Sequence, residues 1–148
     1  MCVYVNSFAQ NENVLDSIIL NSIDLYFHSF DDSDYEWIRN YYSNRIKYVC
    51  KEGFPLGFCF DCSNEYFFHN MDYNSIRELT KSRRRWISSV FLNLKLYADT
   101  IVVNLHDVNI NYKSKRNGTF LSSEGEEYRY HYDVEKAMWI MLPLKHHR

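Results

Sequence analysis

Residues 108–133 read VNINYKSKRNGTFLSSEGEEYRYHYD, and this stretch decides the fold class. At its start, Val108, Ile110 and Tyr112 alternate with asparagines, and near its end three tyrosines alternate with charged or polar residues. Successive side chains of a strand point to opposite faces of a sheet, so this period of two predicts two half-buried strands. Between them, Asn117-Gly118 predicts a tight type I′ turn. The stretch therefore predicts an antiparallel hairpin.

Five further segments are predicted as strands because they are short and either apolar or alternating. Residues 2–5 and 137–142 lie near the two ends of the chain, and residues 22–30 alternate apolar with polar side chains. Residues 56–62 and 65–69 are expected to pair as a second hairpin. Together with the first hairpin, these segments make about seven strands.

Two capping boxes predict where the main helices begin. They start at Ser33 and at Ser75, and each serine is followed three residues later by a glutamate, so that hydroxyl and carboxylate each satisfy a backbone N–H. Apolar residues at a spacing of three and four extend the first helix to Val49 and the second to Tyr97. Residues 14–20 favour a further, short helix.

The length of 148 residues fits one domain. With no linker-like segment and mostly local strand pairs, we expect a single compact α+β domain over residues 1–148. In it, two main helices pack on a mostly antiparallel sheet of five to seven strands.

The composition excludes several classes of protein. Three Trp, 13 Tyr and 10 Phe are too many for a disordered chain, and four Gly with two Pro leave no room for glycine-rich phosphate loops. No apolar run approaches the roughly 20 residues of a transmembrane helix, and the start lacks the features of a signal peptide. We therefore expect a cytoplasmic protein with no membrane partner and with reduced cysteines.

Cysteine and histidine raise the question of a zinc site. Cys50, Cys59, Cys62 and His69 have the side chains of a Cys3His site, but the second C-x2-C pair of a zinc ribbon or knuckle is missing. Free cysteines commonly pack as small hydrophobes, and no βαβ pattern surrounds Cys59 and Cys62 to favour a redox motif. We predict neither a metal nor any other cofactor.

The sequence carries no recognisable enzyme motif, so we do not expect an enzyme. The alternative is a small metal-independent nuclease or an RNA-binding protein. Its phosphate contacts come from Arg83, Arg84 and Arg85, and its proton transfers from His106 and His131. The simpler interpretation of these residues is a solvated helix face and two surface histidines.

Charge is divided unevenly along the chain. Residues 1–74 carry 4 Lys and Arg against 11 Asp and Glu, whereas residues 75–148 carry 13 against 8. If the two halves form different surfaces, one face is acidic and one is basic. The acidic residues include Asp31, Asp32, Asp34 and Glu36.

By elimination, our leading hypothesis is a small stoichiometric inhibitor that binds another protein. In size and composition it is like an immunity protein or antitoxin that neutralises a bacterial toxin, or a phage-encoded anti-defence inhibitor. The expected partner is a basic, nucleic-acid-processing protein, attracted by the four acidic residues and held by the tyrosine face Tyr128, Tyr130 and Tyr132. The simpler interpretation is that the carboxylates serve a helix dipole and the tyrosines pack in the core.

Overall fold

The computed structural model of this chain describes residues 4–5, 14–31, 34–37, 39, 46–81 and 86–143. Two helices, α1 (Val14–His28) and α3 (Tyr73–Thr80), pack on one mixed sheet of seven strands. The strands are β1 (Tyr4–Val5), β2 (Tyr48–Cys50), β3 (Phe67–His69), β4 (Ile87–Leu96), β5 (Thr100–Ser114), β6 (Asn117–Asp133) and β7 (Met138–Met141). Their order in the sheet is β1-β7-β6-β5-β4-β2-β3. The predicted α+β class is confirmed.

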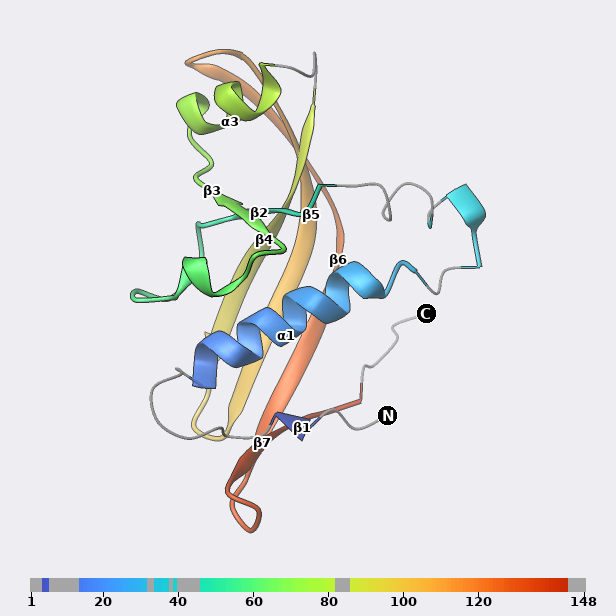
Figure 1. Ribbon diagram of the computed structural model, residues 1–148, viewed down its shortest axis with the longest axis vertical. Helices are drawn as coiled ribbons and strands as arrows, with labels where there is room; N and C mark the ends of the chain where they lie inside the picture. The colour runs from blue at the N-terminus through green and yellow to red at the C-terminus, as the bar shows by residue number, and fades with distance from the viewer. Residues whose placement is uncertain are drawn as a thin grey trace.

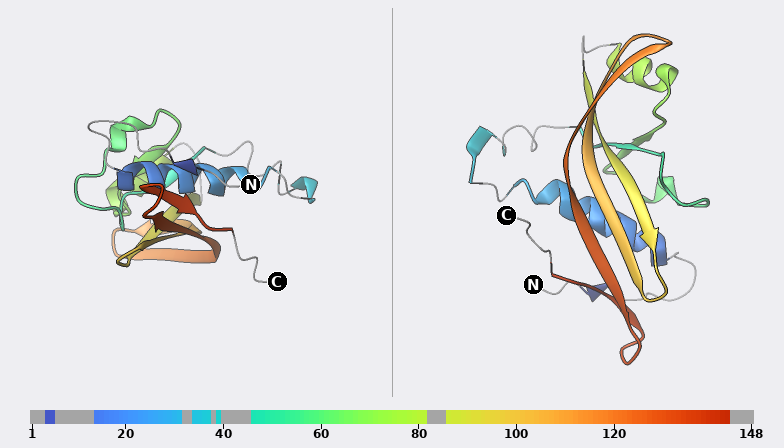
Figure 2. Two further views of the ribbon diagram at one scale, coloured as in Figure 1. Left: turned by 90° about the horizontal axis from the view of Figure 1, so that it is seen from below. Right: turned by 180° about the vertical axis from the view of Figure 1, so that it is seen from behind.

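The sheet curves into a half-barrel, with α1 crossing its concave side (Figures 1 and 2). In Figure 1, α3 lies at one end of the long strands, and the short β1 and β7 lie toward the other. Among the residues that the structure describes, no helix is long and apolar enough to cross a bilayer.

The predicted long hairpin is confirmed as β5 and β6, which pair antiparallel from Thr100 opposite His131 to the turn. Its turn is Lys115-Arg116, and the predicted turn residues Asn117 and Gly118 begin β6 instead. Gly118 lies opposite Tyr112, where a Cβ would come within 2.6 Å of the tyrosine ring. The position of the turn follows from the pairing of β5 with β6, and Gly118 leaves room for the Tyr112 ring beside it.

The prediction of a strand over residues 22–30 is wrong, because this segment continues the helix that begins at Val14. Its apolar residues alternate over a short window, but together with residues 14–20 they follow the helical period. The buried residues of α1 that show this spacing are Ile18, Ile19, Ser22, Ile23, Tyr26 and Phe27.

Both main helices were predicted to continue into segments that form strands in the structure. The second ends at Thr80, begins after Asp72 rather than Ser75, and is followed by β4, which pairs with β5 over ten residues. The Asp72 carboxylate accepts the N–H groups of Asn74 and Ser75, which is the role predicted for the Ser75 hydroxyl. The apolar residues of β4 also fitted a helical spacing, and only the partner strand β5 decides between the two.

The first predicted helix is contradicted at its end, where Tyr48–Cys50 forms β2. This strand is parallel to both β3 and β4. Ser33, the start of the predicted helix, lies outside the described residues. A parallel pairing between distant segments leaves no local signal such as a turn, so the sequence pattern did not reveal it.

The second predicted hairpin is also wrong. Phe67–His69 is a strand as expected, but residues 56–62 are not, and Phe60–Cys62 forms a single 3-10 turn. β3 pairs with β2 instead, with His69 opposite Cys50. The short strands predicted near the two ends are confirmed as β1 and β7.

Candidate functional site

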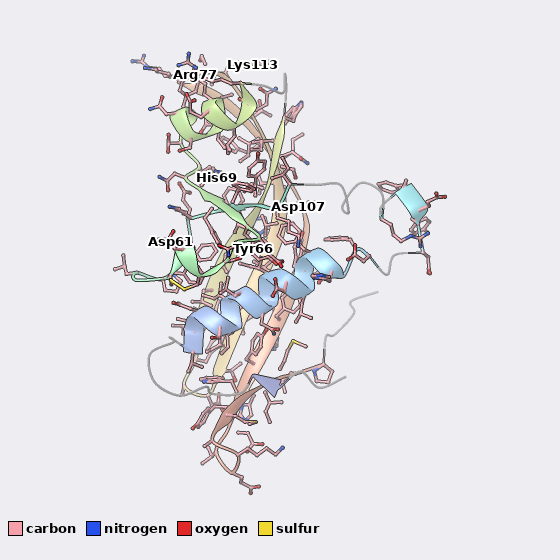
Figure 3. The ribbon with its side chains drawn as sticks, in the orientation of Figure 1. Asp61, Tyr66, His69, Arg77, Asp107 and Lys113 are labelled. Atoms are coloured by element: carbon pink, nitrogen blue, oxygen red, sulfur yellow. A yellow bond between two sulfur atoms is a disulfide. The ribbon has the colours of Figure 1, made fainter. Side chains whose placement is uncertain are left out.

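Positive charge gathers where α3 lies on the tip of the β5–β6 hairpin. We call this surface the basic end and define it by five exposed residues: Arg77, Lys81, Lys113, Lys115 and Arg116. Figure 3 shows Arg77 on α3 and Lys113 on the hairpin at the same end of the molecule. Arg83, Arg84 and Arg85, predicted as phosphate contacts, lie outside the described residues.

A small aromatic and aliphatic core holds α3 on the hairpin. The Tyr112 hydroxyl donates to the carbonyl of Met71 at 3.1 Å, and its ring packs edge-on against Tyr73 and Phe120 at centroid distances of 5.7 and 5.6 Å. Ile76 of α3 is buried in the same cluster as Ile110. The cations of the basic end are therefore carried by two elements that are fixed to each other.

Few carboxylates balance the basic end. Lys81 is paired with Glu78 at 2.5 Å, and within the described residues the other four cations are in no ion pair. Residues 72–81 and 112–121, which the structure describes, carry five Lys and Arg against two Asp and Glu, whereas the rest of the sequence carries 12 against 17. A locally positive potential on an otherwise acidic chain follows from this distribution.

Two exposed aromatic side chains accompany these cations. Trp86 directly precedes β4, and Phe120 lies on β6 opposite Ile110, so that both are carried near the α3 end of the long strands. Aromatic rings stack on unpaired bases, and cations contact the phosphates beside them. The α3 end of the long strands carries both kinds of side chain.

The structure does not bring the predicted histidines together. His106 lies on β5, and His131 lies on β6 opposite Thr100, which comes six residues before His106 in β5. At about 3.3 Å per residue this separates them by roughly 20 Å, too far to share one proton-transfer step. The His106 ring packs on Phe91, and His131 lies 3.8 Å from Asp99.

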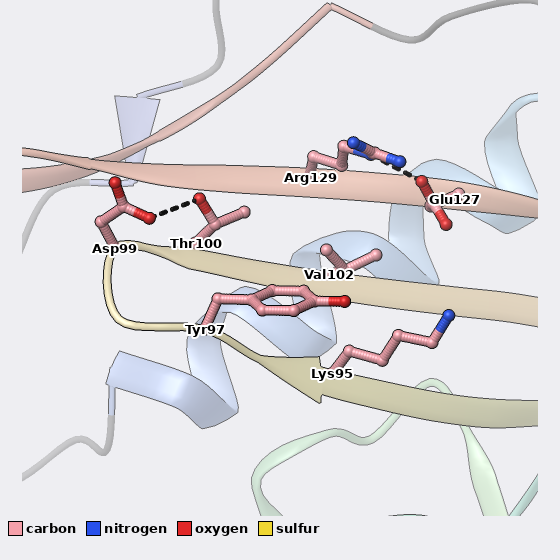
Figure 4. Close-up of a pocket in the computed structure, with 7 residues that line it drawn as sticks. All are labelled: Lys95, Tyr97, Asp99, Thr100, Val102, Glu127 and Arg129. Atoms are coloured by element: carbon pink, nitrogen blue, oxygen red, sulfur yellow. Dashed lines mark hydrogen bonds and ion pairs between the residues drawn. The ribbon is translucent and has the colours of Figure 1, made fainter.

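A shallow pocket lies on the sheet face opposite α1 (Figure 4). Its volume is about 380 Å³, and it is lined by Lys95, Tyr97, Asp99, Thr100, Val102, Glu127 and Arg129. Arg129 is paired with Glu127 at 2.6 Å, and Thr100 donates to Asp99 at 3.0 Å. Its two cations face two carboxylates, so the pocket offers no excess charge to an ionic ligand.

The predicted tyrosine face is not on the surface. Tyr128 and Tyr130 are 1% and 0% exposed, and Tyr132 is half-buried with its ring against Trp139. The prediction of an exposed face is therefore wrong for Tyr128 and Tyr130, because α1 covers this side of β6. The Tyr130 hydroxyl accepts from Asn21 and shares a hydrogen bond with Ser22, both at 2.9 Å.

The predicted acidic residues are exposed where the structure describes them, namely at Asp31, Asp34 and Glu36. Asp32 lies outside the described residues. Beside them Tyr35 and Trp37 are 63% and 69% exposed. Neither ring was among the residues that the sequence pattern predicted as a binding surface. We call Asp31 and residues 34–37 the acidic segment.

The cysteines do not form the zinc site that was considered. Cys59 and Cys62 are joined by a disulfide, which contradicts the expectation of reduced, buried thiols at these positions. Cys50 is free and buried, and burial raises the pKa of its thiol to about 11, so that it stays protonated near neutral pH. Among the described residues, no three His, Cys, Asp or Glu side chains are grouped to hold a metal ion.

His69 and Ser89 form a buried hydrogen-bonded pair. Nδ1 of His69 lies 2.8 Å from the carbonyl oxygen of Asn70, and Nε2 lies 2.8 Å from the hydroxyl of Ser89. Ser89 is completely buried, which leaves no access for a substrate, so this pair holds β3 to β4 and does not act as a nucleophile and its base. Burial lowers the pKa of His69, and the hydrogen bond to Asn70 opposes this in part.

This lowered pKa predicts a pH-dependent stability. The unfolded chain, with His69 near its ordinary pKa of 6.5, binds the proton more tightly than the folded chain. The contribution of neutral His69 to the free energy of unfolding is therefore fully present above pH 6.5. It decreases as the pH falls through and below that value, by at most about 1.4 kcal/mol per pH unit. Urea unfolding of the wild type and of His69→Gln between pH 7.5 and 5 measures this. We expect the free energy of unfolding of the wild type to fall more than that of the variant over this range. An equal fall in both proteins would contradict a lowered pKa at His69.

Comparisons with known proteins add no functional information. No known protein family matches this chain, and no curated protein and no solved structure is significantly similar to it. A functional conclusion therefore has to come from the surfaces described above.

Proposed function

We propose that this chain binds single-stranded nucleic acid through its basic end. The observation that carries the proposal is the concentration of positive charge on α3 and the adjoining hairpin tip, in a chain that is acidic elsewhere. This is the binding part of the RNA-binding alternative, without the catalysis, because His106 and His131 are far apart and neither belongs to the basic end.

In this proposal, contacts to phosphates supply the binding energy, and contacts to bases orient the nucleic acid on the protein. Lys113, Lys115, Arg116 and Arg77 contact phosphates and release the counterions that were condensed on the strand. Phe120 and Trp86 offer faces on which unpaired bases stack, which a duplex does not allow. The rest of the surface is acidic, so it repels the nucleic acid and keeps it at the basic end.

The test is fluorescence anisotropy with a fluorescein-labelled, 20-nucleotide single strand of mixed sequence at several salt concentrations. Contacts from the four or five cations of the basic end predict that log K falls with log salt at a slope of roughly −3 to −3.5. We expect weaker binding to the matching duplex. Failure to bind at low salt, or affinity that does not change with salt, would contradict the proposal. Binding only to vesicles of anionic lipid would assign the basic end to membranes instead.

A second candidate function is protein binding through the acidic segment, as in the inhibitor hypothesis. The observation that favours it is the exposure of Tyr35 and Trp37 beside Asp34 and Glu36, since aromatic anchors ringed by charge are typical of binding surfaces. In this form the proposal keeps the predicted carboxylates and replaces the buried tyrosines by these two rings. The partner is a basic, nucleic-acid-processing protein, as for an immunity protein or an anti-defence inhibitor.

Charge reversal in the acidic segment tests this second candidate. The changes Asp31→Lys, Asp34→Lys and Glu36→Lys are expected to slow association with a partner captured by the wild type, and to remove its acceleration at low salt. Trp37→Ala should instead speed dissociation, because it removes a contact and leaves the charge unchanged. If neither rate changes in surface plasmon resonance, the acidic segment is not the binding surface.

A further inference from the structure

The loop before β3 carries a feature that neither proposed function uses. We propose that Cys59 and Cys62 form a thiol–disulfide exchange site, which passes two electrons to or from a pair of cysteines in another protein. The bond between them is visible beside Asp61 in Figure 3. Both residues are exposed, and only Phe60 and Asp61 separate them.

The position of this disulfide is unlike that of a structural crosslink. A disulfide stabilises a chain most when it closes a long loop, and this one closes a single 3-10 turn. The turn is held by packing instead, because the Phe60 ring contacts Phe54, Phe58 and Phe68 at centroid distances of 5.4, 5.0 and 5.1 Å. The bond can therefore open and close while the aromatic cluster keeps the loop in place.

A buried carboxylate is hydrogen-bonded to the backbone of one of the two cysteines. Asp16 in the first turn of α1 is only 9% exposed, and its Oδ2 accepts the backbone N–H of Cys59 at 3.3 Å. Its Oδ1 is buried and has no hydrogen-bond partner among the described residues. A buried carboxylate with an unpaired oxygen is costly, so its position against Cys59 calls for an explanation. We assign Asp16 as a positioning residue that holds the backbone of Cys59 and keeps a carboxylate next to this residue.

Access for a substrate lies on the side of Cys62. This residue borders a pocket of about 370 Å³ that is also lined by Leu20, Asp24, Asn64, Glu65 and Tyr66. The Tyr66 hydroxyl donates to Asp24 and closes one wall. A peptide segment that carries a cysteine can approach the Cys62 sulfur from this pocket, so Cys62 is the sulfur that a substrate attacks.

The exchange balances without another cofactor. A substrate thiolate attacks Sγ of Cys62, the bond to Cys59 breaks, and its electron pair leaves on Sγ of Cys59, which takes up a proton. A second substrate thiolate then attacks the substrate sulfur of this mixed disulfide and releases the Cys62 thiolate, which is protonated in turn. The substrate dithiol becomes a disulfide, and Cys59 and Cys62 become thiols. With a more oxidising partner the same steps run in reverse.

Buried Cys50 supplies a matched control for a first experiment, the reduction of insulin by dithiothreitol followed by turbidity. We expect the wild-type chain to accelerate it by roughly tenfold or more over dithiothreitol alone. Cys59→Ser and Cys62→Ser should abolish the acceleration, whereas Cys50→Ser should retain it. No acceleration by the wild type, or equal loss in all three variants, would overturn the proposal. The wild-type result decides the matter even if a variant fails to fold.

A second experiment tests the assigned roles with oxidised glutathione as the probe. In the Cys59→Ser variant, Cys62 should accumulate a mixed disulfide with one glutathione, detected by mass spectrometry. In the Asp16→Asn variant, the rate of insulin reduction should change its dependence on pH, while circular dichroism stays that of the wild type. An unchanged pH profile would remove Asp16 from the site. If the wild-type pair stays oxidised in millimolar reduced glutathione, the bond is a structural crosslink only.

Discussion

Replacing Arg77, Lys113 and Arg116 by glutamine is expected to weaken binding to single-stranded nucleic acid about 100-fold at 0.1 M salt. Each phosphate contact contributes about 0.7 to the salt slope, so three lost contacts reduce the slope by about 2 and the affinity by two powers of ten. All three side chains are exposed, and the structure gives them no ion pair among the described residues, so folding should be unaffected. Anisotropy titration between 50 and 200 mM salt measures both quantities.

The control neutralises three exposed cations elsewhere, namely Lys95, Arg129 and Lys136, of which Arg129 and Lys136 are paired with Glu127 and Asp133. It changes the net charge of −2 by the same amount but leaves the basic end intact. We expect its affinity to fall much less than 100-fold, because its charges lie on the opposite part of the long strands. If this variant loses as much affinity as the first, the nucleic acid binds the sheet face around the pocket of Figure 4, and the basic end is not the site.

Replacing Tyr130 by alanine is expected to lower the free energy of unfolding by about 3–5 kcal/mol, as for other large aromatic residues in a core. The ring is fully buried between the sheet and α1, and its hydroxyl is hydrogen-bonded to Asn21 and Ser22. Its loss leaves a cavity and removes the hydrogen bonds of its hydroxyl to Asn21 and Ser22, of which Ser22 keeps its bond to the carbonyl of Ile18. Chemical denaturation measures the change, which is a large share of the 5–15 kcal/mol typical of a domain.

Two substitutions separate packing from hydrogen bonding at this site. Tyr130→Phe keeps the ring and should cost about 1–2 kcal/mol, because only the buried hydroxyl is lost. Tyr132→Ala, on the half-buried ring two residues away, should cost clearly less than Tyr130→Ala. Equal effects at the two positions would mean that β6 does not present Tyr130 to α1 as described.

Much of the fold was predictable where partners are close in sequence. The β5–β6 hairpin, the terminal strand β7 and the α+β class follow from alternation and from short connections. The predictions failed at α1, β2 and β4, whose apolar residues fit two periods within a short window. Which period applies depends on whether a partner strand is present, and for β2 that partner lies across a parallel pairing with no local turn.

The candidate sites divide in the same way. The basic residues of α3 and the hairpin tip are visible in the sequence, but their closeness is not, because about 30 residues separate Lys81 from Lys113. The acidic segment was predicted from its carboxylates, and its exposed rings were missed. The cysteine pair was noticed from its spacing, whereas Asp16 was not, since it lies 43 residues before Cys59 and meets it only in the folded chain.

The sequence by itself determined the class of the fold, the long hairpin and the uneven distribution of charge, because these depend on side-chain period, turn residues and composition. Only the tertiary structure decided which tyrosines are buried, which cations share a surface and which carboxylate lies against the cysteines. The physical reason is that burial depends on which distant segment covers a residue. Here α1 covers β6, and no pattern within β6 records that.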